Sequence, residues 1–224
     1  MNSSHSLCRV ISKKGIMSRK EVAKQIIAGN VCVDGKLIKK PGAVVPLSAK
    51  ITIQGEKQET KNKIYLLLNK PPRCLTTRDD PLKRRTVYDI VKEKEWVFPV
   101  GRLDYDTTGL LIMTNDSEFS EKLASPENKI RKTYIAKIKG AISEEELKKI
   151  NAKLVSTTGL SSRIEIKISE GKNRQVRNLL EGIGKKVISL SRIAIGELRD
   201  NNLKPGAFRK LTSGELKLAL KNER

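Results

Sequence analysis

Residues 101–111 read GRLDYDTTGLL and combine a polar loop with the start of an apolar run. Two acidic residues, Asp104 and Asp106, stand in a glycine-bounded loop that leads into an apolar run. We expect that run, residues 110–114, to form a buried strand. A loop held by a rigid strand is a common place for catalytic side chains. Either acid could equally cap a turn and pair with a nearby arginine, and the residues alone leave both interpretations open.

Outside this stretch, the apolar pattern predicts strands and helices without regular alternation. Such a mixture predicts an α+β fold with a mixed sheet rather than a doubly wound parallel sheet. The chain has no Walker loop and no dinucleotide-binding fingerprint, so we expect no nucleotide cofactor. The further strands are expected at residues 64–68, 133–138 and 163–168, and the helices at residues 143–150 and 174–183.

The beginning of the chain has a helical pattern. Residues 7–28 carry apolar side chains at mostly helical spacing, interrupted at Gly15, which predicts two helices. Ser18 followed by Glu21 has the pattern of a capping box, so the second helix should begin just after Ser18. Six basic residues would then lie on or near these helices: Arg9, Lys13, Lys14, Arg19, Lys20 and Lys24.

A short β region follows the helices. Residues 31–38 read as strand, turn and strand, with Asp34-Gly35 as the turn of a hairpin, and residues 51–53 add another strand. Residues 55–63 are polar and without periodicity, which is typical of a linker. The predicted domains are therefore residues 1–60 and residues 61–224.

The chain is strongly basic. It has 224 residues, with 46 Lys and Arg against 25 Asp and Glu and a formal net charge of +21. Such a field attracts a polyanion, so nucleic acid is the expected partner. The basic residues are spread along the whole chain, which indicates a binding surface built by several elements. Charge alone leaves open a structural role of the kind that ribosomal proteins have.

Cysteine and histidine are too few for several kinds of site. Cys8, Cys32 and Cys74 form no Cys-x-x-Cys pair, so we expect reduced, cytosolic thiols, without a metal site or a disulfide framework. The one histidine is His5, which excludes Ser-His-Asp and Cys-His catalysis and leaves Asp, Glu, Tyr, Lys or Arg. The sequence has no membrane-spanning run and no signal-peptide pattern at its start, so we expect a cytoplasmic protein.

The stretch from Gly101 to Leu111 resembles the Gly-Arg-Leu-Asp-x-x-Thr-x-Gly-Leu-Leu motif of the RsuA/RluB family of pseudouridine synthases. Residues 7–55 are similar to the S4 RNA-binding domain, notably at residues 18–21 and 29–35. The resemblance implies a small S4-like helix-hairpin domain followed by a mixed-sheet synthase domain. Further matches stand in the order of the family: Leu68-Asn69-Lys70-Pro71, Arg85-Thr86-Val87, Lys132-Thr133-Tyr134, the run from Glu170 to Arg177, Leu190, Arg192, Ile195-Gly196, Gly206 and Leu211-Thr212.

The activity that the resemblance implies is the isomerisation of uridine to pseudouridine in ribosomal RNA, in which the uracil leaves its ribose at N1, turns and rejoins through C5. Asp104 would be the nucleophile or general base, and a covalent adduct and a glycal-like intermediate are both open routes. Tyr134 would pack on the uracil and can move a proton, and Arg177 would pair with Asp104 and keep it ionised. On the residues alone, Tyr134 is more often a core aromatic and Arg177 a solvated charge.

The resemblance also implies RNA contacts. Arg102 would enter the space that the flipped base leaves, and Lys70 and Arg174 would bind RNA. Leu190, by itself more often a core residue, would form part of the pocket wall. In the N-terminal domain a solvated charged face competes with phosphate contacts from Arg9, Arg19, Lys20 and Lys24.

The chain departs from the family pattern at two places. The stretch between Ile150 and Ile164 is shorter, so we expect a trimmed loop between motifs. Asn178 stands where a second arginine is usual, which removes one possible phosphate contact. Neither departure touches Asp104.

Two functions from other classes compete with the synthase. A noncatalytic RNA-binding or ribosome-assembly factor could keep the fold, but binding alone does not need Asp104, Tyr134 and Arg177 in one pocket. An RNA N-glycosidase would share the attack at the sugar and release free uracil. We expect the synthase, acting as a monomer on structured ribosomal RNA or a pre-ribosomal particle, with no metal and no cofactor.

Overall fold

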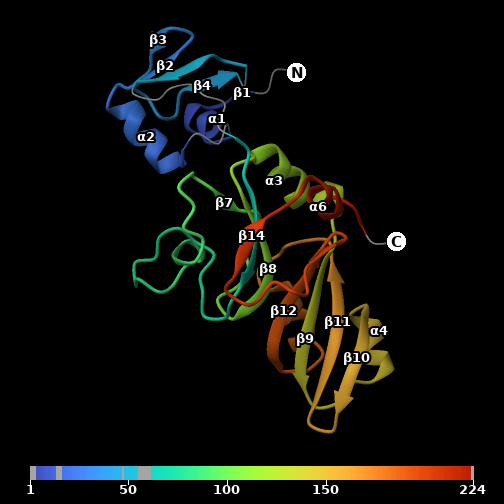
Figure 1. Ribbon diagram of the computed structural model, residues 1–224. Helices are drawn as coiled ribbons and strands as arrows, with labels where there is room; N and C mark the ends of the chain where they lie inside the picture. Colours follow the sequence, from blue (N-terminus) through green and yellow to red (C-terminus); the bar gives the residue numbers. More distant parts are fainter. Residues whose placement is uncertain (1–3, 14–16, 47, 55–61, 223–224) are drawn as a thin grey trace. The chain divides into compact units, whose positions relative to one another are not determined.

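The computed structural model describes residues 4–13, 17–46, 48–54 and 62–222 (Figure 1). The elements that precede residue 62 are β1 (Ser4–Ser6), α1 (Leu7–Lys13), α2 (Arg19–Ile27), β2 (Val31–Val33), β3 (Lys36–Leu37), β4 (Val44–Pro46) and β5 (Ile51–Ile53). The later ones are β6 (Tyr65–Lys70), η1 (Val87–Asp89), β7 (Phe98–Pro99), β8 (Thr107–Thr114), α3 (Ser117–Ala124), η2 (Pro126–Asn128), β9 (Lys132–Lys139), α4 (Glu144–Lys149), β10 (Ala152–Thr158), β11 (Ser161–Ile168), α5 (Gln175–Glu181), β12 (Val187–Ile195), β13 (Leu198–Arg199), β14 (Phe208–Lys210) and α6 (Ser213–Ala219).

These elements form two compact units. One comprises Met1–Ile64, Glu93–Phe98 and Thr114–Phe119, and the other comprises Tyr65–Lys92, Pro99–Met113 and Ser120–Arg224. The predicted linker falls mostly on residues 55–61, which lie outside the described residues, as does the break predicted at Gly15.

The first unit contains the two predicted helices. The Ser18 hydroxyl accepts the N–H of Glu21 at 3.2 Å, so α2 begins where the capping pattern predicts. Burial of the apolar stripes of both helices against short strands stabilises the unit. The core consists of Leu7, Val10, Ile11, Met17, Val22, Ile26, Val31, Val33, Val45, Ala49, Ile51 and Ile53.

The predicted hairpin is present beside the helices. Strand β2 pairs with β3 on one side and with β5 on the other. The turn residues Asp34 and Gly35 have φ of 48° and 80°, as a tight hairpin turn requires. The ribbon of β1 and β4 was not predicted, because β1 consists of Ser4, His5 and Ser6 and has no apolar residue that would mark it as a strand.

The second unit is built on one large sheet, whose strands are labelled from β14 to β10 in Figure 1. Its strands follow the order β10-β11-β9-β12-β8-β6-β14, with β13 paired to β12 and β7 to β8. Strand β12 is parallel to β8 but antiparallel to β9. The sheet is therefore mixed, and the predicted α+β fold is confirmed.

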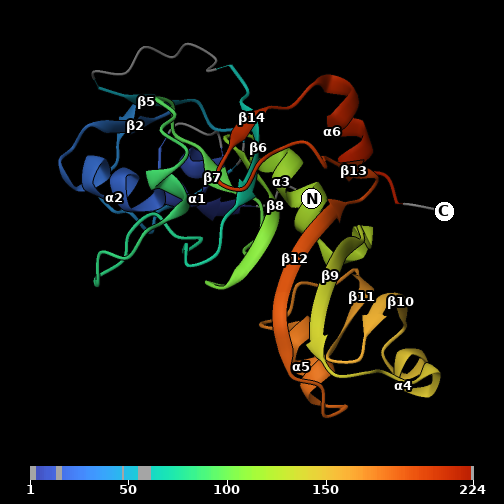
Figure 2. The same ribbon diagram turned by 60° about the horizontal axis from the view of Figure 1, so that its bottom comes forward.

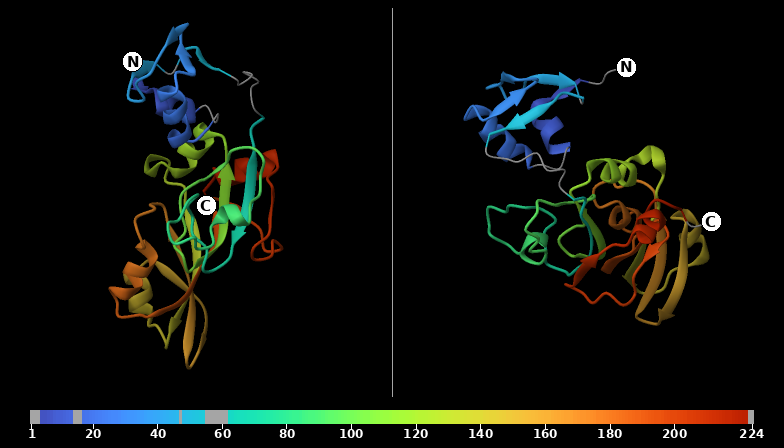
Figure 3. Two further views of the ribbon diagram at one scale, coloured as in Figure 1. Left: turned by 90° about the vertical axis from the view of Figure 1, so that its left-hand side faces the viewer. Right: turned by 45° about the horizontal axis from the view of Figure 1, so that its top comes forward.

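Two helices cover one side of the outer strands. Helix α5 lies beside β12 and α4 beside β10 (Figure 2), and both are on the same side of the sheet in the left view of Figure 3. Their apolar residues Leu147, Val176 and Leu180 are buried. The other face of β9 and β11 carries exposed charges such as Lys137 and Arg163, which lie directly opposite each other.

Most predicted elements of this unit are present. The strands expected at residues 64–68 and 110–114 extend beyond their predicted ends, because β6 continues to Lys70 and β8 begins at Thr107. The polar residues at these ends hide the strands from an apolar pattern. The other expected strands and helices are β9, β11, α4 and α5.

The segment between Ile150 and Ile164, for which we predicted a trimmed loop, is mostly β-strand. It holds β10 and the start of β11, which pair as antiparallel neighbours. Strand β10 is the edge of the sheet and is exposed from Lys153 to Thr158. An edge strand without a buried face has no alternation of apolar and polar residues, so the pattern does not reveal it.

Gly109 marks the closest approach of β8 to β12. Its φ is 104°, and a Cβ there would overlap the backbone carbonyl and lie 2.7 Å from the backbone nitrogen of Arg192. Neither atom can move without breaking the pairing of the two strands. The motif therefore needs glycine at this position for a steric reason.

We expect Gly109→Ala to lower the free energy of unfolding by about 3 kcal/mol or more, because backbone overlap adds to an unfavourable φ. Gly101→Ala is the matched control: its φ is 75°, but no atom lies within 4 Å of the added carbon, so the cost should be about 1 kcal/mol. Urea unfolding of both variants measures the difference. Equal losses would show that the approach of β12 is not what requires Gly109.

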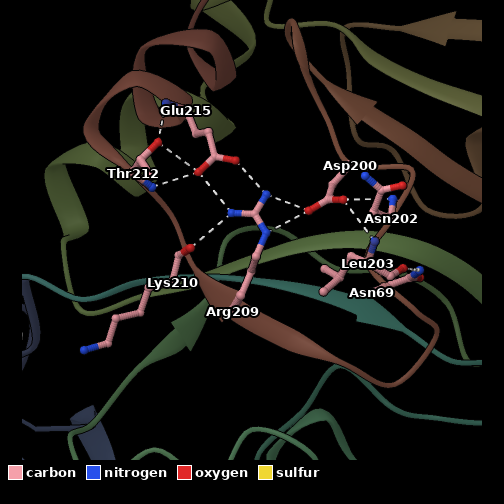
Figure 4. A network of polar contacts seen from close by, with 8 residues as sticks. All are labelled: Asn69, Asp200, Asn202, Leu203, Arg209, Lys210, Thr212 and Glu215. Carbon is pink, nitrogen blue, oxygen red and sulfur yellow. Dashed lines mark hydrogen bonds and ion pairs between the residues drawn. The ribbon is translucent and has the colours of Figure 1, made fainter.

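In the C-terminal segment, the Arg209 side chain lies between two carboxylates and bonds to both (Figure 4). Arg209 Nε donates to Asp200 Oδ2 at 2.8 Å, and its Nη2 donates to Glu215 Oε1 at 2.6 Å. Asp200 accepts the N–H of Leu203 at 3.0 Å, and the Leu203 carbonyl accepts from Asn69 at 2.7 Å. The network thus ties β14 and α6 to the end of β6.

We expect this network to contribute less to the free energy of unfolding at low pH. The bond from Arg209 lowers the pKa of Glu215 from 4.5 to about 2, so its stabilising effect is complete above pH 4.5 and is lost as the pH falls towards 2. Glu215→Gln should cost about 2 kcal/mol at pH 7, allowing for partial exposure, and should reduce the acid sensitivity in that window. Glu181→Gln is the control, since Glu181 is exposed and 3.7 Å from Arg174. The free energy of unfolding is measured with denaturant between pH 2.5 and pH 7. If both variants kept the wild-type pH dependence, Glu215 would not be the group responsible.

Candidate active site

The backbone around Asp104 is held by its neighbours. The Thr76 hydroxyl donates to the Leu103 carbonyl at 2.8 Å and accepts the Leu103 N–H at 3.2 Å. On the other side, the Asp104 carbonyl accepts the N–H of Thr107 at 3.1 Å. The residues before and after Asp104 are therefore fixed, and its carboxylate projects from an ordered stretch of chain.

The Asp104 carboxylate is partly accessible from outside the protein. It is half-buried, whereas Asp106 is exposed. Within the described ranges, no hydrogen bond or ion pair joins the Asp104 carboxylate to another residue. The turn is closed by its carbonyl rather than its side chain, so the interpretation of Asp104 as a turn cap does not apply. A half-buried carboxylate without a protein partner is available to a substrate.

Lys70, at the end of β6, contacts this loop from inside the protein. The residue is fully buried, and its Nζ donates to the backbone carbonyls of Pro71 at 3.0 Å and Tyr105 at 3.2 Å. Burial lowers its pKa to about 8, against the opposing charges of nearby acidic groups that include Asp104 and Asp106. We predicted an RNA contact for Lys70, but a fully buried ammonium has no surface for a phosphate. Its bonds instead hold the loop in place.

Strand pairing brings Tyr134 and Leu190 to the start of β8. Tyr134 lies opposite Arg192, and Leu190 lies opposite Ala136. On its other side, Leu190 is opposite Thr107, three residues after Asp104. Directly opposed residues point to the same face of a sheet, so Tyr134 and Leu190 share a face with Thr107. Both are buried, with 8% and 4% of their surface exposed.

Arg192 is a residue of this face to which the sequence reasoning gave no role. It is 5% exposed, and its Nε donates to the Leu110 carbonyl at 2.6 Å, while its Nη2 is buried without a partner among the described residues. Burial lowers the pKa of neighbouring Lys132 to about 8, and the Arg192 charge adds to the effect. The signal in the sequence is an arginine inside the otherwise uncharged strand β12.

Arg177 projects from α5 and is half-buried. Its Nε is buried without a hydrogen-bond partner in the part of the chain that the structure describes. The ion pair with Asp104 that we predicted is not formed here, since no described acid lies within 4.0 Å of Arg177. Arg174, the residue before α5, is exposed and lies 3.7 Å from Glu181.

The remaining predicted RNA contacts are on the surface. Arg102 is exposed in the loop before β8. The four others belong to the first unit, where α1 carries one and α2 carries three, and all are exposed: Arg9, Arg19, Lys20 and Lys24. None of the helices in the described ranges has the length and apolar character needed to cross a membrane.

Comparisons with known proteins find matches for both parts of the chain. The family model of RNA pseudouridylate synthases matches residues 64–182, and the S4 domain model matches residues 7–51. A "Ribosomal large subunit pseudouridine synthase B" of Bacillus subtilis is 39% identical, with 94% of this chain and 93% of the relative covered. An uncharacterised RNA pseudouridine synthase of Aquifex aeolicus is 35% identical over 93% of this chain and 90% of its own length.

A solved structure has the same fold. The crystal structure of a pseudouridylate synthase superimposes with a TM-score of 0.66 at 25% identity, covering 96% of this chain and 99% of that one. The resemblance seen in the motifs is thereby confirmed along almost the whole chain. The protein belongs to the RNA pseudouridylate synthase family, whose members isomerise uridine in RNA, and it carries an S4 domain before the synthase region.

Proposed function

We propose that this chain converts a specific uridine of ribosomal RNA to pseudouridine, as a cytoplasmic monomer that needs no metal and no cofactor. The observation that carries the proposal is Asp104, a half-buried carboxylate that makes no hydrogen bond or ion pair with any described residue and stands on a loop fixed by Thr76 and Thr107. The choice of ribosomal RNA is supported by the Bacillus subtilis relative, whose name refers to the ribosomal large subunit. The net charge of +21 fits a large, structured RNA.

The reaction exchanges one bond for another and needs no redox partner. The bond between N1 of uracil and C1′ of ribose breaks, and a bond between C5 and C1′ forms. The proton on C5 leaves, and N1 gains a proton, so the atoms of the nucleoside are conserved. Asp104 either attacks C1′ as N1 leaves and is itself displaced when C5 bonds to C1′, or removes a proton from the ribose as a base and returns it when that bond forms. Both routes need an ionised carboxylate beside a uridine turned out of its helix.

Other residues of the sheet face near Asp104 have roles in the proposed reaction. Tyr134 packs on the uracil and moves a proton, and Leu190 forms a wall of the pocket; the strand register that gathers them at the start of β8 supports both roles. Arg177 pairs with Asp104 once RNA is bound. Its Nε is buried without a hydrogen-bond partner among the described residues, which supports that role because such a group is costly until a partner arrives.

The basic residues of the synthase region have two kinds of role: one positions the catalytic loop, and the others contact RNA. Lys70 holds the catalytic loop through the carbonyl of Tyr105. Exposed Arg102 enters the helix where the uridine leaves, and exposed Arg174 binds a phosphate.

We also propose that the chain folds as an S4 domain of residues 1–60 and a synthase domain of residues 61–224. The two family models support this division, since one ends at residue 51 and the other begins at residue 64. The first domain anchors the RNA through the exposed cations of α1 and α2.

The test is the incubation of the purified protein with transcribed ribosomal RNA in EDTA. Pseudouridine should form at one position or very few, and no free uracil should appear. Release of uracil would assign the chain to N-glycosidases, and binding without either product would assign it to noncatalytic RNA-binding factors. Activity that is lost in EDTA and restored by a metal would contradict the metal-free route.

A further inference from the structure

The second unit contains a strongly basic loop whose cations are not among the proposed active-site residues. The basic loop comprises residues 73–86, between β6 and η1. Asp79 and Asp80 are its acidic residues. Its five cations are all exposed: Arg73, Arg78, Lys83, Arg84 and Arg85.

The basic loop is closed at its base and joined to the catalytic loop. The Leu75 N–H donates to the Arg85 carbonyl at 2.9 Å, so the two arms of the loop are bonded to each other. Beside it, the Cys74 N–H donates to the Tyr105 carbonyl at 3.3 Å. Thr76, in the first arm, holds both backbone groups of the residue before Asp104. At the tip, the Arg84 guanidinium lies 6.0 Å from the centre of the Tyr105 ring, and Tyr105 follows Asp104 in the chain, so a ligand held by the basic loop is held near the catalytic loop.

The tip of the basic loop is organised before any ligand arrives. The Asp80 carboxylate accepts from Arg84 Nη2 at 2.7 Å, from its Nε at 3.0 Å and from its backbone N–H at 3.0 Å. These bonds lower the pKa of Asp80 to about 2, so the tip keeps its shape at neutral pH. In the arm, the Arg78 guanidinium lies 4.3 Å from the centre of the Tyr88 ring. Preorganisation of this kind lowers the entropic cost of binding.

Three cations of the basic loop are not bonded to other side chains of the described residues. The side chains of Arg73, Lys83 and Arg85 make no hydrogen bond and no ion pair with any described residue. Like charges gathered on one ordered loop repel one another unless a polyanion lies against them. The phosphates of an RNA strand are spaced along a chain and match several separate cations better than a single small anion does.

We propose that the basic loop binds the phosphates of the RNA strand that carries the target uridine. This inference rests on the proposed function and adds a second RNA contact that belongs to the synthase region itself. Through Thr76, the loop that holds the strand also holds the backbone that presents Asp104. The uridine is thus placed by contacts on the same segment that positions the nucleophile.

The test compares two variants that lose the same charge. The loop variant is Arg73→Gln/Lys83→Gln/Arg85→Gln, and the control is Lys137→Gln/Lys139→Gln/Arg163→Gln on the uncovered face of β9 and β11. All six side chains are exposed. Binding to transcribed ribosomal RNA is titrated against KCl, and pseudouridine formation is measured in the same samples. Thermal melting checks that each variant is folded. If the triple loop variant does not fold, the single variant Lys83→Gln replaces it in the binding measurement.

In the loop variant, the slope of log affinity against log salt should decrease by about two units, and affinity at 0.15 M salt should fall roughly tenfold or more. The control should keep the wild-type slope, and Lys83→Gln should reduce the slope by somewhat less than one unit. Equal slopes for the loop variant and the control, whether both unchanged or both lowered, would overturn the proposal. Failure of the wild type to form pseudouridine would instead refute the proposed function, so the two failures are distinct.

Discussion

Asp104→Asn should reduce pseudouridine formation by about 10⁴-fold or more while RNA affinity stays within a few-fold of wild type. The amide has the shape of the carboxylate but cannot attack C1′ or remove a proton. Folding should be unaffected, because the Asp104 side chain makes no hydrogen bond or ion pair among the described residues. Single-turnover kinetics at saturating RNA measure the chemical step directly, and RNA binding is measured separately by titration.

Asp106→Asn is the matched control for this prediction. Asp106 is exposed two residues further along the same loop, so its replacement should change the rate by less than about tenfold. An equal loss in both variants would mean that the loop needs its negative charge rather than a specific nucleophile. Substantial turnover by the Asp104 variant would remove Asp104 from the chemistry altogether.

Neutralising the basic face of the two N-terminal helices should weaken RNA binding by roughly 100-fold at physiological salt. The variant replaces four exposed residues by glutamine, so the core of the first unit stays intact: Arg9, Arg19, Lys20 and Lys24. The slope of log affinity against log salt should decrease by about three units, because each lost phosphate contact removes somewhat less than one. The single-turnover rate at saturating RNA should stay near that of wild type, since the proposed catalytic residues lie in the second unit.

The same unit offers a control with equal charge. Four other lysines are also exposed, outside the two helices: Lys36, Lys39, Lys40 and Lys50. Their replacement by glutamine should leave the salt slope near the wild-type value. If both quadruple variants weakened binding alike, the helices would not be the anchor, and their cations would form only a solvated face.

Local patterns predicted much of the fold. The helix start at Ser18 and the turn at Asp34-Gly35 depend on neighbours within a few residues, and both are present. The strands β9 and β11 were predicted from their own residues. Strand β10 was not, because it has no buried face to mark it.

The candidate site depends on contacts that local patterns cannot reveal. The motif located Asp104, but the pairing of Leu190 with Thr107 joins segments more than 80 residues apart along the chain. The burial of Lys70 and of Arg192 follows from that packing, and charged residues are normally expected outside. The requirement for Gly109 likewise became clear only once β12 was seen against it.

The most direct test of the central claim is a map of pseudouridines in ribosomal RNA from a strain that lacks this protein. The account predicts that a pseudouridine at one position, or at very few, disappears, that the wild-type protein restores it, and that Asp104→Asn does not. An unchanged ribosomal RNA map in the deletion strain would contradict the claim.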